Sequence, residues 1–145
     1  MKAVLQRVKQ GSVTVGGEEI AAIGPGLVIL LGVGPEDDQE LTRELARKTA
    51  RLRIFEDPEG KMNLSILDTK GEILVVPQFT LYADTSRGNR PSFTGAAKPE
   101  RARKLVDYFC KALQNEGVPT RSGEFGAHML VGIENDGPVT IQLDL

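Results

Sequence analysis

The first residues of the chain alternate between apolar and polar positions, as strands do when they bury one face. Residues 2–9 and 12–15 predict two strands that are broken at Gly11. The Gly16-Gly17 pair predicts a tight turn into a third strand at residues 19–23. The chain is therefore expected to open with a meander of strands.

Two later apolar runs predict strands, the first of them in the interior of a sheet. Residues 27–33, LVILLGV, follow a Gly-Pro-Gly turn and contain no polar side chain, so this strand is expected to be central and covered on both faces. Residues 73–81 predict a second apolar strand after a turn at residues 68–71. A loop rich in Gly, Pro and Ser follows at residues 84–97.

Two segments show apolar residues at helical spacing. The first runs from about residue 37 to residue 55. The second begins near Pro99, a residue favoured in the first turn of a helix, and runs to about Asn115. Each predicted helix has one apolar face: Leu41, Leu45, Thr49 and Leu52 in the first, and Ala102, Leu105, Val106, Phe109 and Leu113 in the second.

The C-terminal residues return to a strand pattern. Residues 127–134 and 139–143 predict two strands joined by a hairpin-type turn at 135–138, which contains an unusual proline. No repeat or linker interrupts the chain. The pattern predicts one α+β domain over residues 1–145, within the broad α/β class, with a mostly antiparallel sheet and two helices packed on one side.

The composition is that of an ordinary globular domain. Hydrophobic residues make up 40% of the 145 residues and the net charge is −2, which excludes a disordered, fibrous or strongly basic chain. The longest apolar run, residues 27–31, is far shorter than a membrane span. The N-terminal residues lack the continuous apolar stretch of a signal peptide, so we expect a cytoplasmic protein with no membrane partner.

A single histidine and a single cysteine limit the available chemistry. Together they cannot build a zinc site of the usual Cys/His type, and although carboxylates alone suit magnesium, we expect no metal and no cofactor. The sequence GxSxG is absent, which argues against a Ser-His-Asp triad. His128 lies in an alternating strand and is interpreted as structural or surface-exposed. Cys110, on the apolar face of the second helix, is interpreted as an inert buried thiol.

Charge is distributed unevenly along the chain. Between Thr85 and Lys111 the local balance is +5, whereas residues 124–145 carry four acidic residues and no Lys or Arg. A basic stretch beside a polar strand end can hold a phosphate backbone, although a solvated helix face is commoner. The basic residues of this stretch are Arg87, Arg90, Lys98, Arg101, Arg103, Lys104 and Lys111.

Three short segments are candidates for chemistry. PQFTL at residues 77–81 places an amide and a hydroxyl at the end of an apolar strand, just before a loop, where sites are common. On its own this segment also fits an ordinary strand with a half-exposed glutamine. Likewise, Gly137-Pro138 alone fits a turn, and RGNRPSF at residues 87–93 fits a flexible cationic loop.

Taken in order, four motifs resemble the D-aminoacyl-tRNA deacylases. They are MKAVLQRV at residues 1–8, PQFTLYAD at 77–84, RGNRPSF at 87–93 and NDGPVT at 135–140, so the resemblance spans the chain. It implies a three-layer β-β-α domain and a cytoplasmic homodimer whose active site crosses the two subunits. It also implies an enzyme that hydrolyses the ester joining a D-amino acid, or glycine, to the 3′ end of tRNA, and that excludes L-aminoacyl-tRNA.

The resemblance also implies roles for individual residues. Gln78, Phe79 and Thr80 would line the ester, and Gly137-Pro138 would match a Gly-cisPro element that enters the partner subunit's pocket and excludes L side chains. The supporting residues would be Arg7 and Met129, and the tRNA-binding residues would be Arg87, Arg90 and Lys104.

For the mechanism, backbone N–H groups of Phe79 and Thr80 would stabilise the oxyanion without an acid or a base. Thr80 as a covalent nucleophile is the competing idea, weakened by the lack of an adjacent base. The family view that the terminal adenosine's 2′-hydroxyl assists catalysis suits a chain with few catalytic side chains.

The chain departs from the family pattern at one position. Pro77 stands where the family usually has serine, and proline has neither a hydroxyl nor a backbone donor. Proline before Gln also occurs in related deacylases that edit L-alanine, which makes that activity the alternative, whereas Phe79 and GPVT favour the D-specific reading. A non-enzymatic RNA-binding module and a metal-dependent hydrolase remain as other classes.

Overall fold

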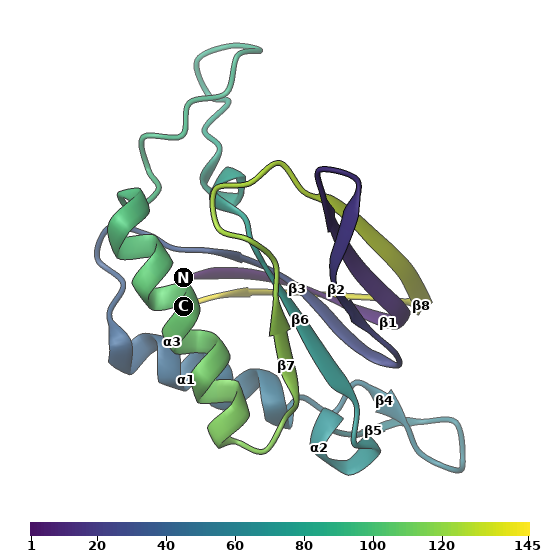
Figure 1. Cartoon of the computed structure of the whole chain (residues 1–145). Helices are drawn as coiled ribbons and strands as arrows, with labels where there is room; N and C mark the ends of the chain where they lie inside the picture. The colour runs from purple at the N-terminus through teal and green to yellow at the C-terminus, as the bar shows by residue number, and fades with distance from the viewer.

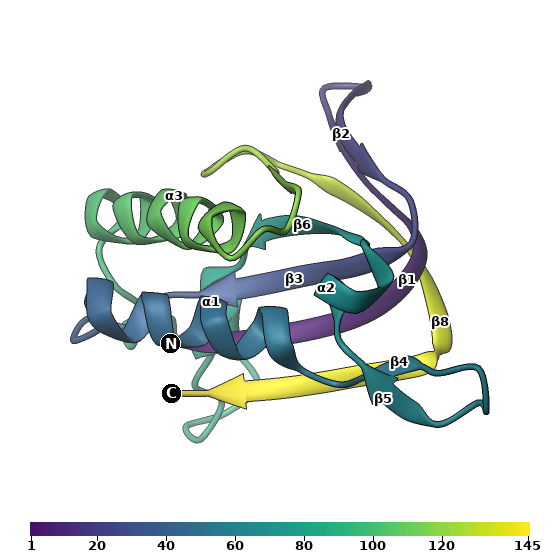
Figure 2. The ribbon, with the colours of Figure 1, turned by 90° about the horizontal axis from the view of Figure 1, so that it is seen from below.

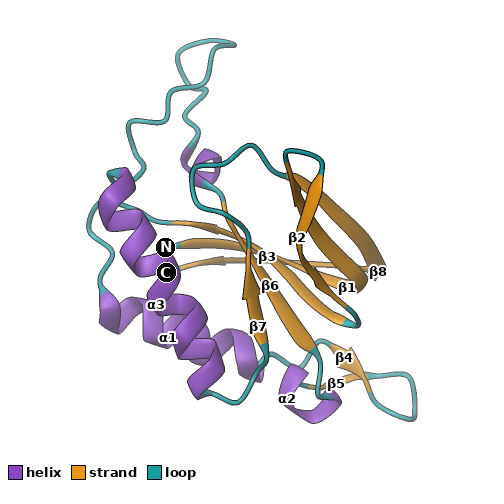
Figure 3. Ribbon diagram, viewed as in Figure 1, coloured by secondary structure: helices purple, strands orange, loops and turns teal.

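Six strands form one mixed sheet that curls over itself (Figures 1 and 3). The computed structural model describes residues 1–145. The long strand β1 pairs antiparallel with three others, and the remaining two pairings are parallel, so the prediction of a mostly antiparallel sheet is confirmed. The order is β2-β1-β3-β6-β7, with β8 also on β1. The bounds are β1 (Lys2–Val15), β2 (Glu18–Ile23), β3 (Gly26–Gly32), β6 (Glu72–Pro77), β7 (Thr120–Ser122) and β8 (Leu130–Asp144).

Two long helices cover one face of the sheet (Figure 2). Helix α3 (Pro99–Asn115) has the predicted bounds, with its proline in the first turn. Helix α1 (Gln39–Arg51) is shorter than the predicted 37–55. The side chain of Asp38 caps its N-terminus by accepting from Leu41 N, and Leu52 leaves helical geometry at φ −60° and ψ 128°. None of the helices is long and apolar enough to cross a membrane.

The central strands β3 and β6 bury both faces, as predicted for β3. On β3 and β6, alternate residues such as Ile29 and Val75 pack against the helices. Their neighbours, such as Val28 and Leu74, pack under a second, smaller core formed with β2 and the far half of β1. The sheet therefore folds back over its own outer face, which produces the three-layer β-β-α arrangement.

The predicted break at Gly11 is wrong, because β1 runs unbroken through it. The strand bends here and passes closely over β3. A Cβ built on Gly11 would lie 2.4 Å from Val28 Cγ2, so only glycine permits this approach. The glycine therefore marks a close contact within a bent strand.

The predicted hairpin at 135–138 is also wrong. Strand β8 pairs with β1 along its whole length, from Leu130 opposite Thr14 to Asp144 opposite Lys2. Residues 136–139 form a bulge within this single strand, opposite Arg7. Since proline cannot donate to a ladder, a bulge is a position where a strand tolerates it.

The second apolar strand is shorter than the predicted 73–81. Gln78 N donates to Leu31 O at 2.8 Å, after which the chain turns into a 3-10 helix, η1 (Phe79–Tyr82). Four short elements were not predicted, because segments of two to four residues show no period. They are β4 (Phe55–Glu56), β5 (Met62–Leu64), α2 (Ile66–Thr69) and β7.

Candidate active site

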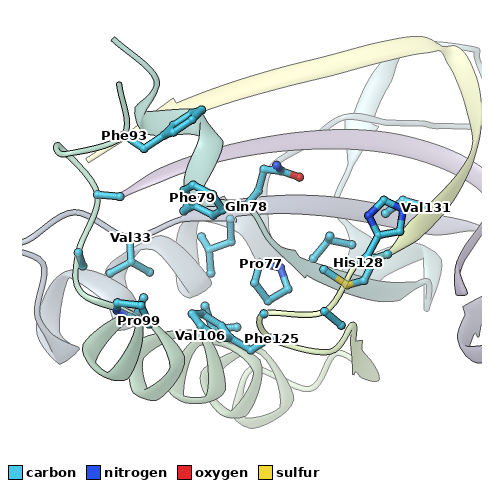
Figure 4. Close-up of a pocket in the computed structure, with 18 residues that line it drawn as sticks. Val33, Pro77, Gln78, Phe79, Phe93, Pro99, Val106, Phe125, His128 and Val131 are labelled. Atoms are coloured by element: carbon cyan, nitrogen blue, oxygen red, sulfur yellow. The ribbon is translucent and has the colours of Figure 1, made fainter. Parts of the chain in front are cut away.

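An apolar cavity of about 530 Å³ opens where β6 ends. Its walls come from the ends of β3 and β6, the start of α3 and the segment before β8. In Figure 4, Phe79 and Phe93 lie on one side, His128 and Val131 on the other, and Pro77 between them. Thirteen of its 18 lining residues are hydrophobic, so the cavity suits a ligand with a large apolar surface.

The turn after β6 brings Gln78, Phe79 and Thr80 to the edge of this cavity. Gln78 and Phe79 line it, and Gln78 Nε2 donates to the Thr80 hydroxyl. The N–H groups of Phe79 and Thr80 are at the start of the 3-10 turn and have no acceptor in the chain. Two backbone donors are thus available to a ligand atom.

Aromatic side chains frame the mouth of the cavity. Phe79 is 58% exposed, and its ring meets the Phe93 ring edge-on with centroids 5.2 Å apart. Met129 lies in the opposite wall, as the resemblance implies, and its Sδ would be 2.7 Å from a Cβ on Gly123. The mouth therefore has an apolar, aromatic rim.

Few ionisable groups lie at this cavity. His128 is the one ionisable side chain that lines it. No group of three or more His, Cys, Asp or Glu side chains is placed to hold a metal ion. Burial raises the pKa of the Cys110 thiol to about 11, so it stays protonated and unreactive at neutral pH.

Arg7 and the Gly137-Pro138 segment lie outside the apolar cavity. The Gly137–Pro138 peptide is cis, and both residues are exposed on the β8 bulge. Arg7 is 4% exposed and holds this bulge from behind: its Nε donates to Asp136 O at 3.3 Å and its Nη1 to Ile54 O at 2.7 Å. Its guanidinium also pairs with the carboxylates of Asp136 and Glu56.

Within one chain, the Gly137-Pro138 segment does not lie near the turn that contains Gln78, Phe79 and Thr80. Arg7 and Asp136 line a second, polar cavity of about 480 Å³, and neither Gly137 nor Pro138 lines the apolar one. Arg7 is level with the start of β6, whereas Gln78 follows its end. At about 3.3 Å per residue, roughly 17 Å of strand separates these levels.

The chain matches a known family over nearly its whole length. Residues 4–144 fit the family described as D-Tyr-tRNA(Tyr) deacylase. The chain belongs to this deacylase family. The D-aminoacyl-tRNA deacylase of Roseiflexus sp. (strain RS-1) is 60% identical over 144 residues, 99% of this chain and 93% of that protein. The D-aminoacyl-tRNA deacylase of Deinococcus radiodurans is 54% identical over all of both chains.

Solved structures also resemble this member of the deacylase family. A protein described as c-Myc DNA Unwinding Element Binding Protein superposes with a TM-score of 0.94 at 47% identity, over 100% of this chain and 99% of its own. A probable eukaryotic D-amino acid tRNA deacylase gives 0.85 at 21% identity, over 99% and 98% of the two chains. Because its sequence identity is low, this second similarity shows only that the two proteins share a fold.

The predicted tRNA-binding residues of this deacylase-family chain lie outside the cavity. Arg87 and Arg90 are exposed on the loop that projects beyond the helices in Figure 1. Lys104 is on α3 and pairs with Glu100 at 3.2 Å. Closer to the cavity is Arg103, whose guanidinium lies 5.0 Å from the centre of the Phe125 ring.

Sequence reasoning missed several residues of the cavity. Phe125 and the start of α3 carried no motif, and Phe93 was noted as part of a cationic loop and of the RGNRPSF motif but was given no role. His128 was interpreted as structural or surface-exposed; it is exposed, and its place in the cavity lining was not predicted. Two signals were usable: Phe93 is the last residue of the RGNRPSF motif, and His128 lies in the predicted strand just before NDGPVT.

Proposed function

We propose that the protein hydrolyses the ester between a D-amino acid and the 3′-terminal adenosine of tRNA, as a cytoplasmic homodimer. Family membership and the names of relatives that match nearly the whole chain support this reaction. The observation that carries the mechanism is the mouth of the apolar cavity, where the N–H groups of Phe79 and Thr80 have no acceptor in the chain.

Hydrolysis requires a water oxygen to attack the ester carbonyl carbon. The attacking water loses a proton and the carbonyl oxygen becomes an oxyanion. The bond to the 3′-oxygen then breaks, that oxygen takes up a proton, and the amino acid leaves as its carboxylate. Backbone donors aimed at the oxyanion lower this barrier, by about 10²–10³-fold in rate for one donor. The N–H groups of Phe79 and Thr80 serve this purpose, and the adenosine's 2′-hydroxyl assists, as the resemblance implies.

Thr80 lines the ester in this proposal and does not attack it. A hydroxyl nucleophile needs a neighbouring base to take its proton. The one side-chain partner of the Thr80 hydroxyl is the amide nitrogen of Gln78, which donates and has no basic lone pair. This arrangement supports water as the nucleophile.

Two copies of the chain complete each other's sites in this proposal. Gly137 and Pro138 are exposed, are braced by Arg7 and do not line the cavity of their own chain. In a two-fold dimer, the segment of each copy enters the cavity of the other, so both sites are equivalent.

The inserted segment selects the hand of the amino acid. At a given Cα, D and L residues exchange the positions of hydrogen and side chain. A rigid wall against one position therefore excludes every L residue without contacting a particular side chain. Glycine passes such a wall, so glycyl-tRNA, including tRNA-Ala mischarged with glycine, is a second substrate class.

The tRNA body is held by charge outside the cavity. Arg87 and Arg90 are exposed and have no carboxylate partner, so both are available to phosphates. Lys104, already paired with Glu100, adds to the same basic stretch.

Editing of L-alanine is a second candidate, favoured by Pro77 at the cavity. Deacylation rates on D-Tyr-, L-Tyr-, Gly- and L-Ala-tRNA decide between the two. The proposal expects rapid release from D-Tyr-tRNA and Gly-tRNA and none above background from L-Tyr-tRNA. Cleavage of L-Ala-tRNA as fast as the D substrate would replace the proposal with L-alanine editing.

The same assay separates the remaining classes. Binding of tRNA without release of amino acid would indicate an RNA-binding module. Loss of activity in chelator, restored by added metal, would indicate a metal-dependent hydrolase.

A further inference from the structure

The turn that contains the backbone donors packs against two glycines, Gly32 at the end of β3 and Gly34 two residues later. A Cβ on Gly32 would lie 3.1 Å from Gln78 O and 3.2 Å from Tyr82 Cδ2. A Cβ on Gly34 would lie 2.8 Å from Tyr82 Oη. The 3-10 turn η1 is therefore in direct contact with the backbone of the chain beyond β3.

Hydrophobic burial does not hold this turn in place. None of the residues of η1 is buried, and Phe79 is 58% exposed. Gln78 N donates to Leu31 O just before the turn, and Ala83 N donates back to Thr80 O at its end. Beyond these bonds, the position of η1 depends on its contacts with β3 and with the groups around Tyr82.

Asp37, after β3, is a buried carboxylate that joins three parts of the chain. It is 7% exposed. Its Oδ2 accepts from Gly34 N at 2.6 Å and its Oδ1 from the α-ammonium of Met1 at 2.8 Å. Its backbone carbonyl accepts from Arg101 of α3, also at 2.6 Å. The carboxylate thus fixes Gly34, against which the Tyr82 hydroxyl lies.

Tyr82 ends η1 and faces this carboxylate. The ammonium of Lys2 lies 5.1 Å from the centre of its ring. Partial burial of the half-exposed ring, and then the negative charges of Asp37 and Asp144, raise the pKa of Tyr82 to about 12. The hydroxyl therefore remains protonated across the range in which an enzyme of this kind works.

We propose that Asp37 and Tyr82 are positioning residues for the deacylation, since they fix η1 so that the N–H groups of Phe79 and Thr80 meet the ester oxyanion. Neither side chain lines the apolar cavity, so each acts through the turn and not on the substrate. The inference rests on the proposed function. A misplacement of about 1 Å in such a turn can cost on the order of 10²-fold in rate.

The first test is Tyr82→Phe, with Tyr108→Phe as its matched control. Tyr108 is the only other tyrosine; its hydroxyl accepts from Arg43, and it does not line the cavity. We expect Tyr82→Phe to lower kcat on D-Tyr-tRNA roughly tenfold with KM unchanged, because substrate binding does not use the hydroxyl. A kcat within twofold of wild type would overturn the proposal.

The second test is Asp37→Asn against Asp38→Asn. Asp38 caps α1, and asparagine caps equally well, so the control removes a neighbouring charge and nothing else. Asp37→Asn is expected to lower kcat on the order of 10²-fold, again at constant KM. An equal fall in the control, or a fall in Asp37→Asn that appears only in KM, would contradict the positioning role.

Titration of tyrosinate by ultraviolet absorbance gives a readout that needs no substrate. Asp37→Asn should lower the pKa of Tyr82 from about 12 towards the ordinary 10.0, because one of the charges that raises it is gone. An unchanged titration would overturn the contact between the two groups. If Asp37→Asn fails to fold, the kcat of Tyr82→Phe alone decides. If the wild type were inactive but the titration changed as predicted, the proposed function would be wrong and the contact between Asp37 and Tyr82 would be supported.

Discussion

The two functional regions lie at opposite ends of the central strands and are held by different means. At one end, Phe79 and Thr80 belong to an exposed turn that offers backbone donors beside an apolar cavity. At the other end, Gly137 and Pro138 protrude on a bulge that a buried arginine holds through its hydrogen bonds.

This difference indicates a division of labour. The backbone donors need an apolar, water-poor surrounding, because hydrogen bonds to an oxyanion are strongest there. The bulge must instead be rigid, and Arg7 provides rigidity because its planar fork donates in fixed directions. In the proposed function, each end alone has half of what stereoselective hydrolysis needs.

The largest effect is expected from removing one backbone donor. Phe79→Pro deletes a single N–H at the first position of η1, where proline's fixed φ suits a helix start. We expect kcat to fall on the order of 10³-fold with the melting temperature nearly unchanged. Phe79→Leu is the matched control, since it loses the ring but keeps the donor, and its kcat should fall far less.

The next largest effect concerns the bulge. Gly137 has φ +113°, and a Cβ there would lie 2.7 Å from Arg7 Nη2. Gly137→Ala should therefore displace the segment and lower kcat/KM for D-Tyr-tRNA by about 10²-fold. Gly60→Ala imposes the same backbone strain at φ +78° with open space around it, so it should leave kcat/KM intact. Equal losses in both variants would attribute the effect to strain alone.

Arg7 and Lys9 both pair with the Asp136 carboxylate, which allows a direct comparison of a buried and an exposed cation. The Arg7 side chain is 5% exposed and the Lys9 side chain 62%. Arg7→Lys should cost about 2 kcal/mol of unfolding free energy, because Ile54 O or Asp136 O loses its donor. Lys9→Ala should cost no more than about 0.5 kcal/mol. Urea titrations of both variants measure the difference.

The smallest effect is expected at the Thr80 side chain. Thr80→Ala keeps both backbone donors, so kcat should stay within about tenfold of wild type. Rapid-quench assays with labelled D-Tyr-tRNA measure it. A loss on the order of 10³-fold with an acyl-enzyme trapped in wild type would make Thr80 the nucleophile.

Much of the fold was predictable because its elements have clear periods. The apolar run 27–33 and helix α3 have long, unambiguous patterns, and both lie where expected. The predicted strand breaks were wrong where a single residue is required by a tertiary contact or a bulge. Gly11 permits a close crossing of strands and Pro138 lies in a bulge, but in sequence both resemble strand breaks.

The site was predictable only through the family motifs. Gln78 and Met129 do lie at one cavity, yet no periodicity distinguishes them from ordinary strand residues. The role proposed for Asp37 had no sequence signal, since its partners Gly34 and Met1 meet only after folding. Contacts between distant segments are invisible to patterns of neighbouring residues.

Complementation between two inactive variants tests most directly whether the two regions meet across copies of the chain. Phe79→Pro and Gly137→Ala are purified separately, mixed in equal amounts, and allowed to exchange subunits, with exchange verified by two different tags. A mixed dimer holds one site with both changes and one with neither, so activity should return to about a quarter of wild type. No activity above that of the separate variants, despite complete exchange, would contradict a site shared between subunits.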